Sequence, residues 1–257
     1  MTLRIKKVDI TLGPWNSHAF LFIPSKEVEL KKAAAVFTHG YTSHKGSILT
    51  WPTRLAEEGI ASILFDLPGH YLGSFNEVNS FEEFKKDSHK LFQSAYNQLS
   101  NEVDTKDKKI ILGGHSLGGL LACKALALSE FDGVDKMAIA VGLGLAPEKG
   151  THLFETDFYK STLIIREQLV SAELNHENVF NWLKSEKESL SVSDNRVHLI
   201  TGMDDLVVGK SGSERLKELL ESKNNTVTLD RPTKLPHHMP EMGASFVKKF
   251  LKSEGII

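Results

Sequence analysis

Short apolar runs rich in Ile, Val, Phe and Leu recur along the chain, and most are followed by a longer stretch whose apolar residues have helical spacing. This alternation predicts an α/β fold, with a mostly parallel sheet covered by helices on both faces. A hairpin at the front of the chain brings the count of predicted strands to eight. The predicted strands cover about 3–12, 18–23, 33–39, 61–66, 109–113, 137–145, 196–201 and 226–230. The predicted helices lie near 47–58, 80–100, 117–129, 212–222 and 241–253.

One connection breaks this rhythm, because about fifty residues separate the strand ending near Leu145 from the strand starting near Arg196. Connections in α/β units are usually far shorter. Residues 147–195 are therefore expected to form an insert of one or two helices over the sheet edge, a candidate lid. The alternative is one ordinary helix with long flanking loops. The aromatic residues of the insert are candidates for an acyl pocket or, as is more common, for simple core packing. They are Phe154, Phe158, Phe180 and Trp182.

Composition adds limits rather than a function. At 257 residues the chain can bury roughly three quarters of its unfolded surface, so residues 1–257 are expected to form a single domain. Its 40% hydrophobic and 25% charged residues exclude disordered, fibrous and membrane classes. The net charge of −2 selects no partner, and the short basic run "KDKK" at 106–109 is typical of a solvated loop. We therefore expect no nucleic-acid partner.

The cysteine content and the N-terminus indicate a compartment. Cys123 is the only cysteine and lies in the apolar stretch "LLACKALAL", which favours core packing and fits a compartment that keeps thiols reduced. The first fifteen residues lack the apolar core of a signal peptide. No window reaches eighteen uncharged apolar residues, so no membrane span is expected. These observations predict a cytoplasmic protein.

The candidate chemistry centres on "GGHSLGG", in which Gly114, Ser116 and Gly118 fit G-x-S-x-G. Such a pattern arises by chance in about one 250-residue chain in ten. Here it follows a buried-strand run and opens an apolar helix, which is the context of a nucleophile elbow. A glycine-rich phosphate-binding turn is the alternative, but the glycines of a dinucleotide fingerprint and the Gly-Lys-Ser/Thr of a P-loop are absent. "GLGLAP" at 142–147 follows a late strand and lacks the third fingerprint glycine.

A serine nucleophile needs a base, and the base needs an acid to orient it. The segment "GMDD" follows a predicted strand and offers Asp205 as the acid, with Asp204 as the alternative. The segment "PHHMP" precedes the last predicted helix and offers His237 or His238 as the base. His237 is preferred because Met239 and then Pro240 follow it, but both histidines remain candidates. Proximity alone cannot select the base, since further histidines lie at predicted strand ends. They are His39, His44, His70 and His115.

The oxyanion of a serine hydrolase is bound by two backbone amides. One follows the nucleophile, and the other comes from the loop after the first strand of the βα series. In this chain those positions are Leu117 and Tyr41, the latter within "THGYTSHKG".

Taken together, these segments resemble the α/β-hydrolase superfamily over nearly the whole chain. "HGYTSHKG" is similar to its oxyanion loop, "FDLPGHYLGS" to its D-x-P-G-H-G-x-S segment and "GGHSLGG" to its elbow. "GMDD" and "PHHMP" then resemble its acid and base, in the order Ser, Asp, His that the fold prescribes. The chain departs from the pattern at Tyr71 and Leu72, where a single glycine is usual, so we expect a bulkier loop near the pocket.

The resemblance implies a carboxylesterase-like serine hydrolase that cleaves a small or medium acyl ester through an acyl-enzyme, with neither metal nor cofactor. A serine at the elbow is unlike haloalkane dehalogenases and epoxide hydrolases of this superfamily, which carry an aspartate there. Thioesterase, amidase or peptidase, and lactonase activities are alternatives on the same fold. The alternative outside enzymes is a non-catalytic protein of the same fold that binds a small ligand or a partner in the pocket where its catalytic relatives bind substrate. The expected partner is a small acyl substrate, and the sequence predicts no oligomeric state.

Overall fold

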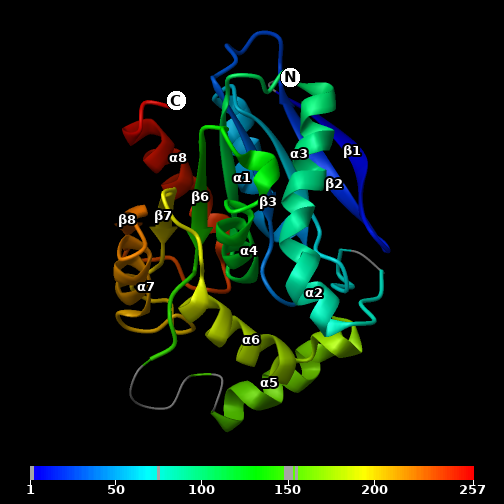
Figure 1. Ribbon diagram of the computed structural model, residues 1–257, viewed down its shortest axis with the longest axis vertical. Helices are drawn as coiled ribbons and strands as arrows, with labels where there is room; N and C mark the ends of the chain where they lie inside the picture. Colours follow the sequence, from blue (N-terminus) through cyan, green and yellow to red (C-terminus); the bar gives the residue numbers. More distant parts are fainter. Residues whose placement is uncertain (1–2, 74–75, 148–152, 154–155) are drawn as a thin grey trace.

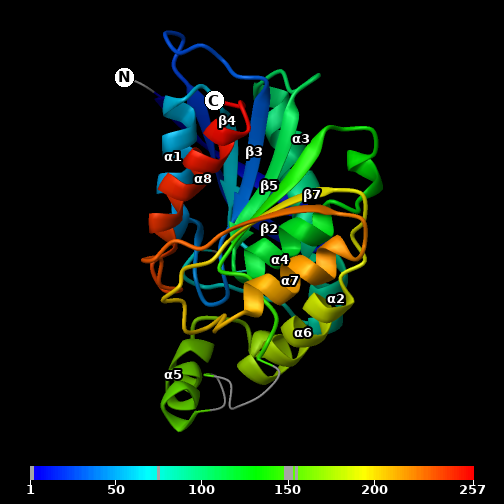
Figure 2. The ribbon, with the colours of Figure 1, turned by 90° about the vertical axis from the view of Figure 1, so that its left-hand side faces the viewer.

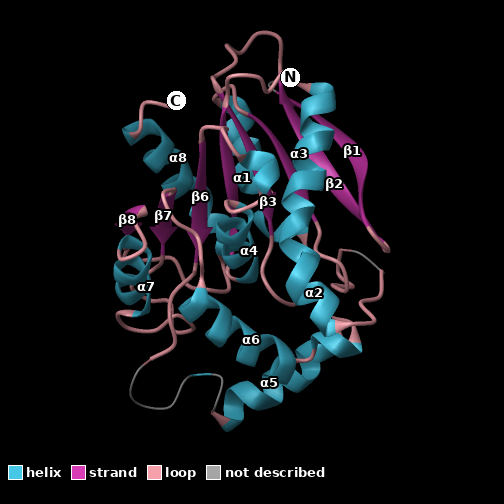
Figure 3. Ribbon diagram, viewed as in Figure 1, coloured by secondary structure: helices cyan, strands magenta, loops and turns pink. Residues whose placement is uncertain are grey.

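The central feature of the protein is an eight-stranded sheet (Figures 1 and 3). The computed structural model describes residues 3–73, 76–147, 153 and 156–257. Within these the strand order is β1-β2-β4-β3-β5-β6-β7-β8; β2 runs antiparallel to both β1 and β4, and all other neighbours are parallel. The strands are β1 (Leu3–Leu12), β2 (Trp15–Pro24), β3 (Ala33–Thr38), β4 (Ala61–Phe65), β5 (Lys109–His115), β6 (Lys136–Val141), β7 (Arg196–Ile200) and β8 (Thr226–Asp230).

Helices cover both faces of the sheet, as Figure 2 shows from the side. Helices α1 and α8 pack together on one face, whereas α3, α4 and α7 lie on the other. The α/β-hydrolase architecture expected from the sequence is therefore confirmed. The helices are α1 (Thr50–Glu57), α2 (Phe81–Asp87), α3 (Leu91–Glu102), α4 (Leu117–Ala125), α5 (Asp157–Glu167), α6 (His176–Ser189), α7 (Gly212–Glu221) and α8 (Gly243–Ser253).

The two-sided core follows from the strand period of two. Every residue of β3 is buried, and alternate side chains point to opposite faces. Ala34 and Val36 join the larger core beneath α3 and α4, whereas Ala35 and Phe37 join the core beneath α1 and α8. A strand buried on both faces must be apolar at every position, which is why these runs lack the alternation of a half-exposed strand.

Several predicted elements differ from the structure at their ends, and two of the differences have a clear local cause. The strand expected over 137–145 ends at Val141, because Gly142 adopts a φ of +67° and turns the chain. The helix expected over 80–100 is divided into α2 and α3 by a 3₁₀ turn over 88–90. The division lets the two halves meet different partners: Phe84 packs edge-on against Trp15, while Phe92 packs edge-on against Phe65.

The insert contributes α5 and α6, which lie beyond the carboxyl ends of the parallel strands (Figure 1). The side chain of Asn175 caps the first turn of α6 by accepting a hydrogen bond from the amide of Asn178. Trp182 anchors this helix to the body of the protein, with its ring centroid 5.9 Å from Phe81 and 6.1 Å from Phe84. Position 182 is therefore core rather than pocket lining. Phe154 lies outside the described residues.

Replacing Phe84 by Ala is expected to lower the free energy of unfolding by about 3–5 kcal/mol, because it leaves a cavity between Trp15 and Trp182. Phe158 is 79% exposed, so Phe158→Ala makes the same chemical change with an expected effect within about 0.5 kcal/mol. Urea unfolding of both variants measures the difference. Equal losses would contradict the assigned packing.

Candidate active site

Ser116 lies on a sharp turn between β5 and α4, with φ +51° and ψ −112°. Its amide donates a hydrogen bond of 2.8 Å to the carbonyl of Val141, and its own carbonyl accepts one of 3.1 Å from the amide of Leu120. A positive φ at a residue other than glycine costs roughly 1–3 kcal/mol, so the surroundings must hold this conformation in place. The turn presents the serine side chain to solvent-accessible space, as the elbow motif predicts.

The glycines of the elbow are required by close backbone contacts. A Cβ atom on Gly118 would lie 2.5 Å from the carbonyl oxygen of His39 and 2.6 Å from that of Thr38. A Cβ on Gly114 would lie 2.5 Å from the carbonyl carbon of Gly118. No side chain fits at these distances, so the start of α4 can approach the end of β3 only through glycine.

His237 is paired with Asp205, although 32 residues separate them along the chain. His237 Nδ1 lies 2.8 Å from Asp205 Oδ2. The other carboxylate oxygen of Asp205 accepts hydrogen bonds of 2.9 Å from the amides of Val207 and Val208. The buried carboxylate of Asp205 thus has three hydrogen-bond partners, as a buried charged group requires. A carboxylate only accepts, so in the neutral imidazole the proton lies on Nδ1 and the lone pair on Nε2.

The alternative base and acid, His238 and Asp204, make other contacts. His238 Nε2 is 3.0 Å from the hydroxyl of Tyr159 on α5, and burial lowers the pKa of His238. Asp204 Oδ1 accepts a hydrogen bond of 2.8 Å from the amide of Leu235, which ties two loops together. Of the two histidines and two aspartates open at the sequence level, the structure pairs His237 with Asp205.

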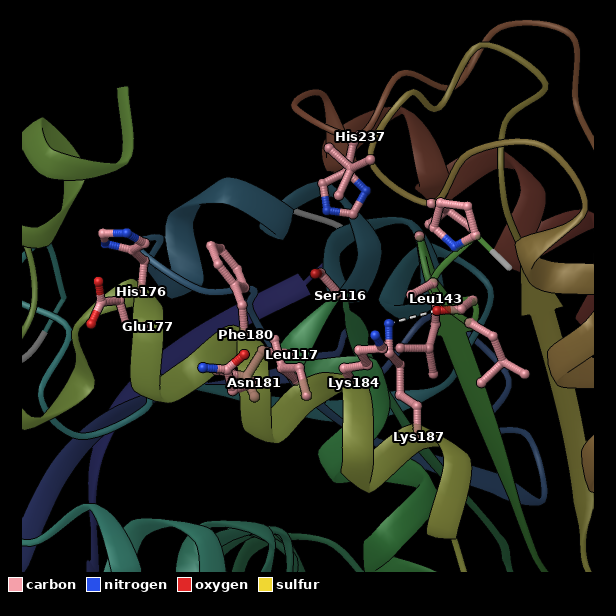
Figure 4. A pocket seen from close by; sticks show the side chains of 18 of the residues that line it. Ser116, Leu117, Leu143, His176, Glu177, Phe180, Asn181, Lys184, Lys187 and His237 are labelled. Carbon is pink, nitrogen blue, oxygen red and sulfur yellow. Dashed lines mark hydrogen bonds between the residues drawn. The ribbon is translucent and has the colours of Figure 1, made fainter. Parts of the chain in front are cut away.

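Two cavities of about 330 and 360 Å³ meet at Ser116. Ser116, Phe180 and His237 line both of them, and Figure 4 shows these three side chains around the first. Leu117 lines the first cavity and Tyr41 the second, so both residues whose amides are expected to bind the oxyanion border a cavity that Ser116 also lines. Among the described residues, no acceptor binds either amide.

Tyr41 also connects this site to the insert. Its hydroxyl donates a hydrogen bond of 2.6 Å to the carbonyl of Leu174, and its ring lies edge-on to Phe180, with centroids 5.4 Å apart. Burial raises the pKa of Tyr41, which keeps the hydroxyl protonated as a donor. Of the four insert aromatics, Phe180 lines the cavities, whereas Phe158 is exposed.

His115 also lies at the site. The elbow motif leaves this position open, so the motif did not predict its contact with His237. It is buried, and its ring centroid lies 4.6 Å from that of His237. Burial, together with the nearby imidazoles of His237, His238 and His39, lowers the pKa of His115 well below its ordinary value. A neutral His115 can therefore pack beside His237 without repelling a charge that forms there.

The loop that carries Tyr41 is held by an ion pair that the sequence reading missed. The buried carboxylate of Asp66 binds the ammonium of Lys45 and accepts a hydrogen bond of 2.7 Å from its amide. His39 Nδ1 donates to the carbonyl of Gly40 at 2.8 Å, and Nε2 accepts from the amide of Leu67 at 3.0 Å. An aspartate directly after an all-buried strand was the available signal, because a buried carboxylate requires a partner.

The segment "FDLPGHYLGS" contacts the insert at Tyr71, one of the two residues that depart from the family pattern. The Tyr71 amide donates a hydrogen bond of 2.9 Å to the carbonyl of Leu169, and its hydroxyl donates to Glu77. Leu72 lines the second cavity. The extra bulk expected from the sequence thus contributes to the wall of that cavity.

Neither a metal cluster nor a membrane-spanning helix is found in the part of the chain that the structure describes. No three His, Cys, Asp or Glu residues there are grouped so that they could hold a metal ion. None of the helices there has both the length and the apolar character needed to cross a bilayer.

Comparison with known proteins places the chain in a family. The model of the serine aminopeptidase S33 family matches residues 30–188, which is more than half of the chain. The chain belongs to the serine aminopeptidase S33 family. The matched range contains Ser116 and ends before Asp205 and His237. No curated protein matches this S33 family member.

Solved structures share the fold of this S33 family member at low sequence identity. An esterase of Pyrobaculum calidifontis superposes with a TM-score of 0.68 at 16% identity over 99% of this chain and 87% of that chain. A 2-hydroxy-6-oxo-6-phenylhexa-2,4-dienoate hydrolase from Rhodococcus sp. strain RHA1 has a TM-score of 0.62 at 16% identity, covering 98% and 99%. An acylaminoacyl peptidase of Pyrococcus horikoshii has a TM-score of 0.65 at 14% identity, and the match covers 98% of this chain but only 42% of the peptidase.

Buried histidines near the site predict a pH dependence of stability. Burial lowers the pKa of His39 to about 3 and that of His70 to about 3, against an ordinary value of 6.5. Below pH 6.5 the unfolded chain binds protons that the folded chain does not, so the free energy of unfolding falls as the pH drops from 6.5 toward 3. Each histidine contributes up to about 1.4 kcal/mol per pH unit. Urea unfolding between about pH 7 and pH 5 should show a shallower slope for His70→Gln, and an unchanged slope would contradict its neutral state.

Proposed function

We propose that this protein is a serine hydrolase that cleaves a small or medium acyl ester, with Ser116 as nucleophile, His237 as base and Asp205 as orienting acid. The observation that carries the proposal is the pairing of His237 Nδ1 with the buried Asp205 carboxylate on a histidine that shares two cavities with Ser116. This arrangement leaves Nε2 available as the proton acceptor that a serine hydroxyl requires.

The proposed reaction has two halves. As substrate binds, Ser116 Oγ gives its proton to His237 Nε2 and attacks the acyl carbonyl carbon, while Asp205 stabilises the imidazolium that forms. The amides of Tyr41 and Leu117 bind the oxyanion, and the leaving alkoxide takes the proton from His237 as the bond to the acyl carbon breaks. Water then attacks the acyl-enzyme with His237 again as base, which releases the acid and restores Ser116.

Ester cleavage is supported by the esterases among the solved structures that share the fold, and the size of both cavities suits a small or medium acyl group. Thioesterase, amidase and lactonase activities use the same groups, and a non-catalytic ligand-binding role would leave them unused. The family description names an aminopeptidase as a second candidate. The first cavity opposes that activity, because its described lining residues include Lys160, Lys184 and Lys187 and one acid, Glu177. A free N-terminal ammonium would be repelled there.

The nucleophile is tested by replacing Ser116 with Ala. Hydrolysis of para-nitrophenyl esters is expected to fall by about 10⁶ in kcat, as it does when other serine hydrolases lose a triad serine. The wild type should be labelled by a fluorophosphonate, which reacts with an activated serine, and the variant should not. Ser129→Ala on an exposed turn is the matched control and should retain both properties. An unlabelled wild type would favour the non-catalytic role.

The base and acid are tested with adjacent pairs of variants. His237→Ala should lower kcat/KM by at least about 10⁴, and Asp205→Asn by about 10⁴, because each removes the proton acceptor or its correct tautomer. His238→Ala and Asp204→Asn are the matched neighbours and should stay within about tenfold of wild type in the same ester assay. A reversed order within either pair would contradict the assignment.

A further inference from the structure

One face of α6 forms a continuous wall of the first cavity. Glu177, Phe180, Lys184 and Lys187 follow one another at spacings of three or four residues, which places them along one stripe of the helix. Figure 4 shows Lys184 and Lys187 toward one end of this helix face, and Glu177 beside His176 toward the other end. Trp182, on the opposite stripe, fixes the rotation of the helix by packing against α2.

Lys187 is the unusual member of this stripe because its ammonium is largely buried at the cavity wall. It donates one hydrogen bond, of 2.6 Å, to the carbonyl of Gly144. An ammonium has three protons, and within the described residues no carboxylate contacts this one. Burial lowers the pKa of Lys187 to about 8, and the charge of Glu188 partly offsets the effect. A buried cation with unused donors is costly unless an anion joins it.

The rest of the cavity has the same sign of charge. Lys184 lies one turn before Lys187 and is exposed, with no ion-pair partner among the described residues. Lys160 approaches from α5. Glu177 is the one described acid on the cavity wall, and ten residues of helix place it about 15 Å along the axis from Lys187. Among the described residues, the charged side chains at the end of the cavity near Gly144 are therefore cationic.

We infer that the first cavity binds a carboxylate carried by the substrate, with Lys187 as its principal ligand and Lys184 as a second cation. The inference rests on the proposed function and narrows its substrate class to acyl esters that bear a negative charge. A carboxylate accepts several hydrogen bonds and would use the donors that Lys187 leaves free. The neutral, apolar walls formed by Leu143, Phe180 and Val207 would enclose the linker between that charge and the scissile bond.

The charge preference is tested with two esters that share a methylumbelliferyl leaving group. One acyl part is glutarate with a free carboxylate, and the other is its methyl half-ester. The wild type should prefer the charged ester, and Lys187→Met should lower the ratio of kcat/KM for charged over neutral ester roughly 10- to 100-fold. Lys184→Gln, at an exposed position that does not disturb packing, should lower it by a smaller factor. Lys210→Met removes an exposed lysine that lines neither cavity and should leave the ratio unchanged.

A second pair of esters locates the charge within the substrate. Phenyl acetate and 4-carboxyphenyl acetate carry it on the leaving group instead of on the acyl part. A preference in this pair that Lys187→Met removes would support the cavity and place the carboxylate on the leaving-group side. Equal rates within both pairs, unchanged by Lys187→Met and Lys184→Gln, would overturn the inference.

Binding without turnover separates this inference from the proposed function. In the Ser116→Ala protein, calorimetry with glutarate should detect binding that weakens at least tenfold when Lys187→Met is added. Glutarate binding that depends on Lys187 would support the cavity even if neither ester were hydrolysed, an outcome that would contradict only the hydrolase proposal. Absence of glutarate binding, or equal binding by both proteins, would overturn the inference while leaving the catalytic assignment to its own tests.

Discussion

The close contact between the start of α4 and the end of β3 is the constraint on which the site depends. Gly118 lies against the carbonyls of Thr38 and His39, and Gly114 lies against Gly118, at distances that no side chain permits. This contact holds the strained turn at Ser116 beside the loop that carries Tyr41. The proposed nucleophile and the loop proposed to supply an oxyanion amide therefore share one rigid junction, and the packed cores on both faces of the sheet support the strained turn at Ser116.

The buried ionisable groups around this junction differ in how their charge is compensated. The Asp205 carboxylate is surrounded by three donors, and Asp66 is neutralised by Lys45, so both buried acids have their partners. The buried imidazoles of His39 and His115 are kept neutral by desolvation. Lys187 is the contrast, since its ammonium reaches the cavity with one carbonyl as its acceptor. The charges of Asp205 and Asp66 are fully paired within the fold, whereas the ammonium of Lys187 keeps donors that a ligand could use.

Much of this arrangement could be predicted from the sequence, because the strands are apolar runs and the elbow is a local motif. The order of Ser116, Asp205 and His237 along the chain followed from the fold that the motifs resemble. The sequence favoured His237 over His238 only slightly, since neighbouring residues in a loop differ mainly in which tertiary contacts they make, here with Asp205 or with Tyr159. The end of β6 at Gly142 was missed for a related reason. Apolar residues continue past the turn, which depends on the positive φ of Gly142, and a side chain at that position would press against His115 and His237.

The hydroxyl of Tyr41 gives the insert a structural hold on the site. Because Tyr41 donates to Leu174 and its ring packs on Phe180, the residue whose main-chain amide is proposed to bind the oxyanion is held by its side chain to the segment leading into α6. A movement of that segment away from the site would break the hydrogen bond between Tyr41 and Leu174 and separate the rings of Tyr41 and Phe180. The phenol of Tyr41 thus links the position of this segment to the position of the proposed oxyanion loop.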